Sequence, residues 1–528
     1  MKVLIVGGVA GGASAAARLR RLDESLEIVL FERGEYISFA NCGLPYYIGG
    51  HITNKAALTL QTPQSFRDRF NVDVRVQQEV VAIQKDAKTV TVKNHKTGES
   101  YTESYDKLLL SMGAEPIRPN IEGLHSPKVF TLRNIPDTYR IKDYIEQNHP
   151  RSAVVVGGGY IGVEMAENLK HAGLNVSLIE MANQVIAPLD ADMASDVHRH
   201  IEQKGVHLLL GNAITAVEEN ANGLHITLNQ GTLDADMLIL AIGIKPETDI
   251  AKNAGIPVNE RGFIITNERM QTTDENIYAV GDAVEITEFV TKEKAAIPLA
   301  GPANKQGRIA ADNICGIASN YTGTQGSAIL KVFDLTVATT GINEKTAQRL
   351  GLNYDKSFTY SASHATYYPG AVNMSVKTIF EKDTGKILGA QLVGYDGTDK
   401  RCDVLATAIR FGATAHDLTH YSSAKDPVNM AGYVIENLLT GKFRQIHWHD
   451  VKNLPRDGSI TLLDVRMELE YENNHLEGFI NIPLNALRAR LHELDAKKPV
   501  YIVCQTGLRS YIACRMLLQH GFTVYSLS

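Results

Sequence analysis

Two cysteines stand in segments whose neighbouring residues could support sulfur chemistry. Cys42 lies in SFANCGLPYYIGG, where Asn, Gly and Pro argue against an inert buried cysteine. Cys504 ends the apolar run PVYIV and precedes a segment typical of a helix. At such a turn, backbone N–H groups and the helix dipole stabilise a thiolate or a persulfide. Arg509 adds positive charge, and the Cys-x4-Arg loop is one residue shorter than the phosphatase loop, which favours sulfur over phosphate.

The isolation of Cys42 limits what it can do. The next cysteine along the chain is Cys315, so no neighbouring thiol can resolve an oxidised Cys42. Cys42 must therefore pass through a sulfenic acid or through a mixed disulfide with an external thiol. The five cysteines are few, odd in number and scattered, which favours a reducing compartment and predicts a cytoplasmic protein.

A dinucleotide-binding unit is indicated over residues 152–180. An apolar strand leads into Gly157-x-Gly159-x-x-Gly162, a helix follows, and a second strand ends at Glu180. The first glycine permits the tight turn, the second lets a pyrophosphate approach, and the third lets helix and strand pack closely. An acid at the position of Glu180 binds a ribose 2′-hydroxyl and repels a 2′-phosphate. The pattern favours NADH, with NADPH as the alternative.

Residues 2–32 repeat the same arrangement less regularly. Gly7 and Gly12 keep the outer glycine positions, Val9 replaces the middle one, and Glu32 ends the second strand. A downstream Gly281-Asp282 pair, which follows an apolar strand, supplies the second contact that a flavin ribityl chain needs. Two such units predict two dinucleotides, a flavin and a nicotinamide.

Composition sets the remaining limits. With 528 residues and 44% apolar content, three or four domains are expected at roughly 150 residues each. A net charge of -6 does not favour binding to nucleic acid, so no nucleic-acid partner is expected. The N-terminal apolar run is shorter than the ~18 residues that a membrane span needs, so no membrane association is expected. His447 and His449 lack further ligands nearby, so no metal site is predicted.

Several longer motifs identify a family. The segments SFANCGLPYYIGG, GGVAGGASAAARLRR, LAGPANKQGR, YYPGA and SSAKDPVNMAG resemble coenzyme A disulfide reductases. The segments LLDVR, HLEGFINIP and VCQTGLRS resemble a rhodanese. Essentially the whole chain resembles the fused coenzyme A-disulfide reductase–rhodanese proteins, which are also described as NADH-dependent persulfide or polysulfide reductases.

The resemblance implies an α/β architecture with two Rossmann-like domains, an α+β dimerisation domain and a C-terminal rhodanese-like α/β domain. The expected divisions are FAD-binding (1–115 and 250–325), NAD(P)H-binding (116–249), dimerisation (326–440), linker (441–452) and rhodanese-like (453–528).

The resemblance also implies site residues. The expected FAD contacts are Gly7, Gly8, Ala10, Gly11, Gly12, Glu32, Arg33, Val80, Ser111, Gly113, Gly281, Asp282, Pro298, Leu299 and Ala300. The expected nicotinamide-nucleotide contacts are Gly157, Gly159, Tyr160, Ile161, Gly162, Glu180 and Gly243. The expected coenzyme A contacts are Ser14, Arg18, Arg21, Ser38, Asn41, Asn304, Arg308 and Lys425.

The implied reaction passes hydride from NADH to FAD and two electrons on to the Cys42 sulfur, which attacks a coenzyme A disulfide or persulfide. Tyr367 matches a catalytic tyrosine that the family supplies from the opposite subunit, which implies a homodimer. Catalytic roles are expected for Cys42, Tyr367, Cys504 and Arg509.

Departures from the family pattern leave alternatives open. A tyrosine-bearing stretch that the family carries before SSAKDP is missing, so that HDLTH runs directly into Tyr421. Related NADH oxidases and peroxidases carry a histidine in the first glycine loop, where this chain has Val9 and Ala10. That difference favours thiol chemistry over an oxidase or peroxidase using a Cys42 sulfenate. A third hypothesis is a low-turnover flavin- and coenzyme A-binding sulfur carrier or sensor.

Overall fold

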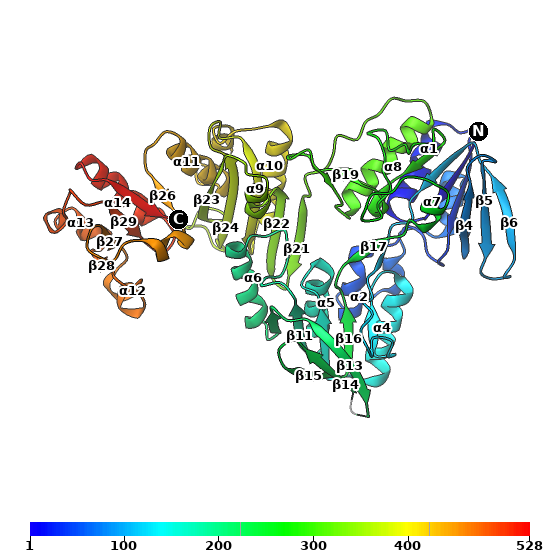
Figure 1. Cartoon of the computed structure of the whole chain (residues 1–528), viewed down its shortest axis with the longest axis horizontal. Helices are drawn as coiled ribbons and strands as arrows, with labels where there is room; N and C mark the ends of the chain where they lie inside the picture. The colour runs from blue at the N-terminus through cyan, green and yellow to red at the C-terminus, as the bar shows by residue number, and fades with distance from the viewer. Residues whose placement is uncertain (222, 422) are drawn as a thin grey trace. The chain divides into compact units, whose positions relative to one another are not determined.

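The computed structural model describes residues 1–221, 223–421 and 423–528. These residues divide into two compact units (Figure 1). Unit 1 comprises Met1–Ala187 and Ala194–Gly326, and unit 2 comprises Pro188–Met193 and Ser327–Ser528. The short segment 188–193 thus belongs to the second unit although the chain on both sides of it belongs to the first.

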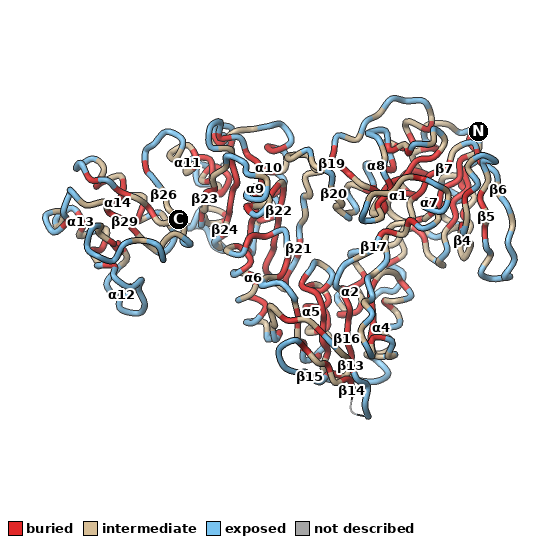
Figure 2. The backbone as a smooth tube through the Cα atoms, in the orientation of Figure 1, coloured by how far each residue is buried: buried red, intermediate tan, exposed pale blue. Residues whose placement is uncertain are grey.

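The first sheet of unit 1 is parallel, with strand order β18-β7-β1-β2-β3. Its strands are β1 (Lys2–Val6), β2 (Glu27–Glu32), β3 (Asp73–Val76), β7 (Lys107–Leu110) and β18 (Ile277–Ala279). Around it lie α1 (Ala10–Leu22), α3 (Pro63–Phe70), α7 (Asp249–Asn253) and α8 (Ala300–Ile314), and the antiparallel sheet β4 (Gln78–Gln84), β5 (Thr89–Asn94) and β6 (Ser100–Ser104). The central strands are near-continuous apolar runs because both of their faces are covered, as Figure 2 shows.

A second parallel sheet in unit 1 has the order β12-β11-β10-β16-β9. Its strands are β9 (Val129–Thr131), β10 (Ser152–Val156), β11 (Asn175–Glu180), β12 (His207–Leu210) and β16 (Met237–Leu240). Its helices are α4 (Ile135–Asn148), α5 (Tyr160–His171) and α6 (Ala191–Gln203), and β13 (Ile214–Asn220), β14 (Gly223–Leu228) and β15 (Thr232–Ala235) form an antiparallel sheet. The chain crosses between the two Rossmann-like domains through β8 (Ala114–Pro116) and β17 (Ile244–Pro246), which pair with each other.

Unit 2 contains an antiparallel sheet in the order β21-β22-β25-β24-β23. The strands are β21 (Ala328–Val332), β22 (Leu335–Gly341), β23 (Tyr354–Ala362), β24 (Asn373–Glu381) and β25 (Ile387–Gly394). Helix α9 (Glu344–Arg349) follows β22, α10 (Thr398–Phe411) packs on β22 and β25, and α11 (Pro427–Leu439) packs on β23 and β24.

The C-terminal part of unit 2 is a parallel sheet in the order β26-β30-β29-β27-β28. It comprises β26 (Gln445–Ile446), β27 (Thr461–Asp464), β28 (Ile480–Asn481), β29 (Val500–Val503) and β30 (Val524–Leu527), with α12 (Glu468–Asn473), α13 (Leu484–Leu487) and α14 (Leu508–Gln519). Residues 445–446 lie in the segment expected to be a linker, yet they form an edge strand, because their backbone pairs with β30. The apolar core beneath this sheet extends to Val434 and Leu438 of α11.

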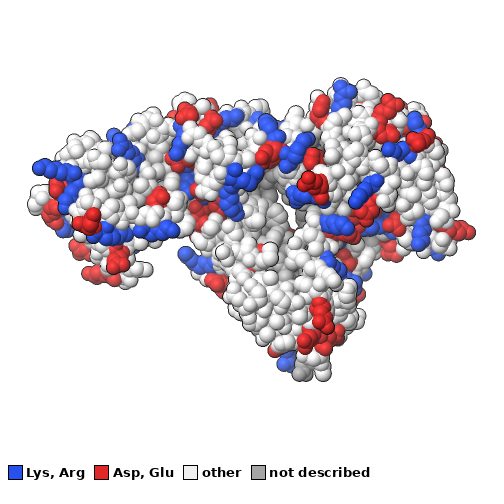
Figure 3. All heavy atoms as spheres, viewed as in Figure 1, with Lys and Arg blue, Asp and Glu red and all other residues white. Residues whose placement is uncertain are grey.

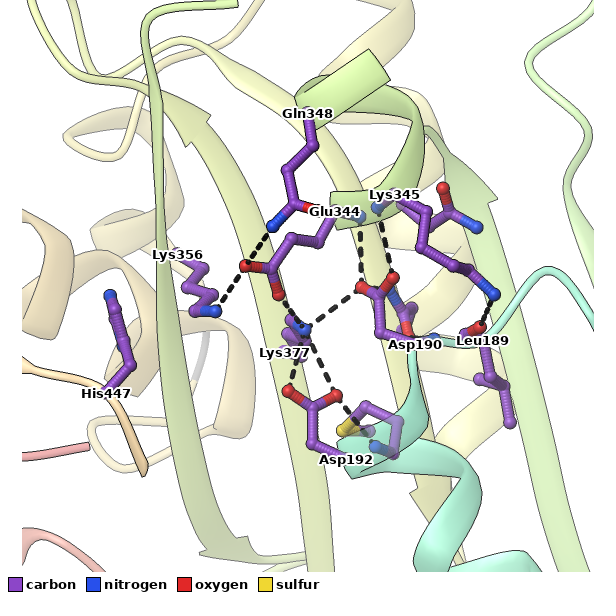
Figure 4. Close-up of polar contacts among 12 residues, drawn as sticks. Leu189, Asp190, Asp192, Glu344, Lys345, Gln348, Lys356, Lys377 and His447 are labelled. Atoms are coloured by element: carbon purple, nitrogen blue, oxygen red, sulfur yellow. Dashed lines mark hydrogen bonds and ion pairs between the residues drawn. The ribbon is translucent and has the colours of Figure 1, made fainter. Parts of the chain in front are cut away.

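A network of buried charges ties segment 188–193 to the antiparallel sheet (Figure 4). The side chain of Lys377 on β24 is fully buried, and its Nζ lies 3.0 Å from Asp190, 2.8 Å from Asp192 and 2.7 Å from Glu344. Lys356 forms a second ion pair with Glu344. Burial opposes the charge of Lys377, but the two aspartates outweigh it and raise its pKa. We name these residues the Lys377 network.

No helix of the described ranges is long and apolar enough to cross a bilayer.

Candidate active site

The two glycine loops of unit 1 have the same geometry. In the first, Gly7 ends β1 with φ +98°, and a Cβ on Gly12 would lie 1.9 Å from the Gly7 carbonyl oxygen. In the second, Gly157 ends β10 with φ +110°, and a Cβ on Gly162 would lie 1.8 Å from the Gly157 carbonyl oxygen. Only glycine fits the third position, because the helix must pass this close to the end of the strand.

The predicted ribose acids are hydrogen-bonded to these loops. The Gly8 N–H donates to Glu32 over 3.0 Å, and the Gly158 N–H donates to Glu180 over 2.6 Å. Each acid therefore sits at the carboxyl end of its strand, beside the N-terminus of the helix that precedes that strand. At Gly159, which caps α5, an added Cβ would meet no atom within 4 Å. The residues thus fit a dinucleotide whose phosphates lie at the positive end of α1 or α5.

Other predicted FAD residues gather near the first loop. Gly281, Asp282, Pro298 and Leu299 line one pocket, and Ala300 begins helix α8 beside it. Burial raises the pKa of Asp282, whereas Arg133 lowers it. Ser111 lies against the first glycine loop: its carbonyl oxygen would be 2.2 Å from a Cβ on Gly7, and its Oγ would be 2.9 Å from a Cβ on Gly11. Gly113 has φ +72°. Arg33 forms an ion pair with Glu247, and the Val80 side chain lies in the core.

The Cys42 segment is anchored to the first glycine loop. The Ser38 N–H donates to the Gly8 carbonyl over 2.9 Å, and Ser38 has the uncommon φ of +44°. Cys42 follows in the short 3-10 helix η1 (Asn41–Gly43), directly before α2 (Leu44–Gly49). This anchoring holds the exposed Cys42 near the end of the strand where a flavin is expected.

Helix α2 also packs against α5 of the second Rossmann-like domain. A Cβ on Gly49 would lie 2.3 Å from Asn168 Oδ1, so the two helices are in close contact. Glu164 on α5 hydrogen-bonds with Tyr46 on α2. The cysteine segment therefore contacts both dinucleotide-binding domains.

Glu164 and Tyr46 were missed by the sequence reasoning. Burial and the neighbouring Glu167 raise the pKa of Glu164 to about 7, while Tyr46 lowers it. Burial also raises the pKa of the Cys42 thiol, and Glu164 raises it further. The sequence marked these two residues only by position. Tyr46 lies in the cysteine motif, and Glu164 lies two residues after Gly162 of the second glycine motif.

The expected coenzyme A contacts on α1 and α8 are brought together. Ser14 hydrogen-bonds with Asn304, and Arg18 forms an ion pair with Asp312 at 2.8 Å. Arg21 and Arg308 are exposed on the same two helices. An anion reaching Arg18 must therefore compete with Asp312, which the sequence reasoning did not anticipate.

Tyr367 and Lys425 belong to unit 2 and are exposed. The Tyr367 side chain is 91% exposed, so it adds little to the packing of its own chain. Tyr421 caps the 3-10 helix η4 (Asp417–His420), and its backbone N–H and carbonyl are both bonded to the side chain of Asn429. Asn429 thus holds the backbone at Tyr421.

Cys504 lies between β29 and α14, as predicted. Its Sγ accepts hydrogen bonds from the N–H groups of Gly507 at 3.1 Å and Ser510 at 3.3 Å. Gly507 has φ +90°, a conformation that turns its N–H toward the sulfur. This loop, residues 504–510, is called the sulfur loop below. It can stabilise a thiolate or a persulfide anion.

Both arginines near the sulfur loop are held by acids. Arg509 forms two hydrogen bonds with Glu470, at 2.6 and 2.7 Å, and Arg466 is paired with the fully buried Asp464. Hydrogen bonds from Arg509 lower the pKa of Glu470 to about 2, so this pair is ionised at neutral pH. Sequence reasoning missed Glu470, because the acidic segment ELEYEN reads as a solvated helix face.

Comparisons with known proteins agree with this geometry. Residues 1–307 match the family model described as pyridine nucleotide-disulphide oxidoreductase, residues 327–427 match its dimerisation domain, and residues 447–528 match the rhodanese-like domain. The chain is 38% identical over 442 residues to the coenzyme A disulfide reductase of Staphylococcus epidermidis, which covers 82% of this chain and 99% of that protein.

Two solved structures match the whole chain. Reduced CoADR-RHD of Bacillus anthracis is 51% identical, with a TM-score of 0.97 and coverage of 100% of this chain and 96% of that one. A NAD-dependent persulfide reductase from A. fulgidus is 37% identical, with a TM-score of 0.93 and coverage of 100% and 99%.

Paired Rossmann-like domains that share a cysteine segment define an oxidoreductase that uses two dinucleotides. The chain belongs to the pyridine nucleotide-disulphide oxidoreductase family and carries a fused rhodanese-like domain. The predicted family, fold class and oxidoreductase activity are confirmed.

Proposed function

We propose that this chain uses NAD(P)H and FAD to reduce coenzyme A disulfide, coenzyme A persulfide or polysulfide at Cys42, with Cys504 supplying sulfane sulfur. The observation that carries the proposal is the position of Cys42. It is exposed on a segment that contacts both dinucleotide-binding domains, and its sequence neighbourhood offers no second thiol.

When bound, the flavin supplies two electrons from the nicotinamide to the cysteine sulfur. The residues of the chain do the rest. The Cys42 thiolate attacks one sulfur of the substrate, the S–S bond of the substrate breaks, and a thiolate or hydrosulfide leaves. Two electrons and a proton then return the Cys42 mixed disulfide to the thiol and release the second product.

Glu164 and Tyr46 can hold the proton that this cycle requires. Because Glu164 has a pKa of about 7 beside Cys42, it can take up or release a proton near neutral pH. NADH is preferred over NADPH, because a 2′-phosphate would lie against the carboxylate of Glu180. The presence of a dimerisation domain supports a homodimer in which Tyr367 serves the site of the other subunit.

The test is anaerobic NADH turnover by the purified protein with coenzyme A persulfide, measured as sulfide release. We expect Cys42→Ser to lose this activity, while Cys315→Ser retains it. If Cys42→Ser still releases sulfide at the wild-type rate, the proposal is wrong. Mass spectrometry of Cys42 separates the alternatives, because a coenzyme A adduct supports thiol chemistry and a sulfenate or sulfinate supports an oxidase or peroxidase.

A further inference from the structure

Two exposed segments of unit 2 carry residues that the proposed function assigns to the site of the other subunit. The loop between β23 and β24, residues 363–372, carries Tyr367, and Lys425 lies shortly before α11 (Figure 1). We name residues 363–372 the tyrosine loop. Because Tyr367 is 91% exposed, contacts of its own side chain contribute little to its placement. The backbone beneath the loop must therefore set where this side chain stands.

One side chain joins the two segments. Arg401 on α10 is largely buried, and its Nη2 donates to the Ser363 carbonyl over 2.7 Å and to Asp426 Oδ2 over 2.8 Å. Its Nε donates to the same carboxylate oxygen over 3.2 Å, and its Nη1 donates to the Gly397 carbonyl over 3.2 Å. Ser363 begins the tyrosine loop, and Asp426 directly follows Lys425. Arg401 therefore links the start of the tyrosine loop to the segment that carries the lysine.

Each end of this link is fixed in its own element. Ser363 is buried, and its N–H donates to the Val372 carbonyl over 2.8 Å, which closes the neck of the tyrosine loop. Asp426 caps α11, because its Oδ1 accepts the Val428 N–H over 3.0 Å. A guanidinium presents its N–H donors in a rigid plane. Arg401 thus sets the distance between the neck of the tyrosine loop and the N-terminus of α11.

The charges around these segments are of both signs. Figure 3 shows Lys and Arg side chains near Asp and Glu side chains over the antiparallel part of unit 2. Neighbouring charges of opposite sign weaken each other's field at a distance. The placement of individual groups therefore matters more here than long-range attraction of an anionic substrate.

We propose that Arg401 is a positioning residue, which holds Tyr367 and Lys425 in the orientation that the site of the other subunit requires. This inference rests on the proposed function, in which the tyrosine of one subunit serves the Cys42 site of the other. It adds a residue that acts on the reaction through the tyrosine loop and the segment before α11. A substitution of Arg401 on one chain should therefore be felt at the cysteine of the opposite chain.

Hybrid dimers of the full-length protein test this consequence. Each hybrid contains Cys42→Ser once and Arg401→Gln once, so one Cys42 remains. In the same-chain hybrid, both substitutions lie on one chain, and the remaining Cys42 is served by a tyrosine loop that has lost Arg401. In the opposite-chain hybrid, the remaining Cys42 lies on the chain with Arg401→Gln and is served by an intact tyrosine loop.

The measurement is anaerobic NADH turnover with coenzyme A persulfide, followed as sulfide release. The reference is a hybrid with Cys42→Ser on one chain and no other substitution. We expect the same-chain hybrid to lose about tenfold or more in kcat, because a misplacement of about 1 Å can cost that much. The opposite-chain hybrid should keep the reference rate. Lys400→Gln, at an exposed neighbouring position on α10, is the matched control and should keep the reference rate in both arrangements.

The two hybrids contain the same substitutions, so a general loss of stability affects them equally. An equal loss in both hybrids, a loss confined to the opposite-chain hybrid, or a same-chain hybrid at the reference rate would each overturn the proposal. Arg401→Lys is the second variant, for use if Arg401→Gln does not fold. It keeps a positive charge beside Asp426, but one ammonium cannot reproduce the planar set of donors. It should show the same difference between the hybrids.

Failure of this inference is distinguishable from failure of the proposed function. Tyr367→Phe, placed on the same chain as Cys42→Ser, tests the role of the tyrosine directly. If that hybrid loses activity and the Arg401→Gln hybrid does not, only this inference fails. If Tyr367→Phe keeps the reference rate, or if the purified protein is a monomer, the proposed function loses its second subunit and this inference falls with it.

Discussion

Replacing Lys377 by methionine tests whether buried charge holds unit 2 together. Methionine fills most of the volume of the lysine stem but removes the positive charge that contacts Asp190, Asp192 and Glu344. Glu344 keeps Lys356 as a partner, whereas the two aspartates lose the ammonium between them. Asp190 is itself buried, so its charge would remain with little access to water.

The expected cost follows from the geometry. Removing one partner of a buried ion pair costs about 3–5 kcal/mol, because the remaining charge is uncompensated. For a unit of this size, each kcal/mol lowers Tm by about 2–4 °C. We therefore expect the transition that reports unit 2 to move down by roughly 6–20 °C at pH 7.

The assay is thermal unfolding of the full chain at several pH values, with Lys400→Met as the control, since Lys400 is exposed on α10. In Lys377→Met, the carboxylates of Asp190 and Asp192 lose the ammonium between them, and protonating them removes the uncompensated charge. The deficit in stability should therefore shrink as the pH is lowered. A loss below about 1 kcal/mol, or a deficit that grows on acidification, would refute the reasoning.

Three further predictions concern the sites. Removing the charge of Glu164, whose pKa is about 7, should lower the pKa of Cys42. Cys42 in Glu164→Gln should therefore be alkylated by iodoacetamide faster than in the wild type above pH 7, and at a similar rate well below pH 7. Equal rates at every pH would contradict the proposed coupling. Gly162→Ala should weaken NADH binding at least about tenfold by calorimetry, because its Cβ would lie 1.8 Å from the Gly157 carbonyl oxygen, and unchanged affinity would show that the loop can relax. Gly507→Ala should slow persulfide formation in the sulfur loop several-fold, because an L-residue at φ +90° costs about 1–2 kcal/mol, and a wild-type rate would show that this conformation is not needed.

In the wild-type chain, Glu344 gives unit 2 a contribution to stability that acid removes. Burial alone would raise the pKa of Glu344, but hydrogen bonds from Lys356 and Lys377 lower it to about 2. Because the pKa of the folded state lies below the unfolded value, this contribution is present above about pH 4.5. It should be lost as the pH falls from there toward 2, which acid titration followed by circular dichroism would detect.

The sequence by itself determined the dinucleotide loops, the isolated Cys42 and the strand-to-helix position of Cys504. Each of these depends on local backbone requirements, such as a glycine after an apolar strand and a second glycine where the helix passes close to it. Such requirements are written within a few consecutive residues. The family and the order of its domains could be predicted for the same reason.

Tertiary structure alone decided which charges meet. Glu164 lies beside Tyr46 because α2 packs on α5, and Glu470 reaches Arg509 from a helix that reads as solvated. The charge of Lys377 can be buried because acids from two distant parts of the chain, segment 188–193 and Glu344, converge on it. Pairing of this kind requires charged groups to approach within a few ångströms in space. Such proximity leaves no spacing pattern in the sequence.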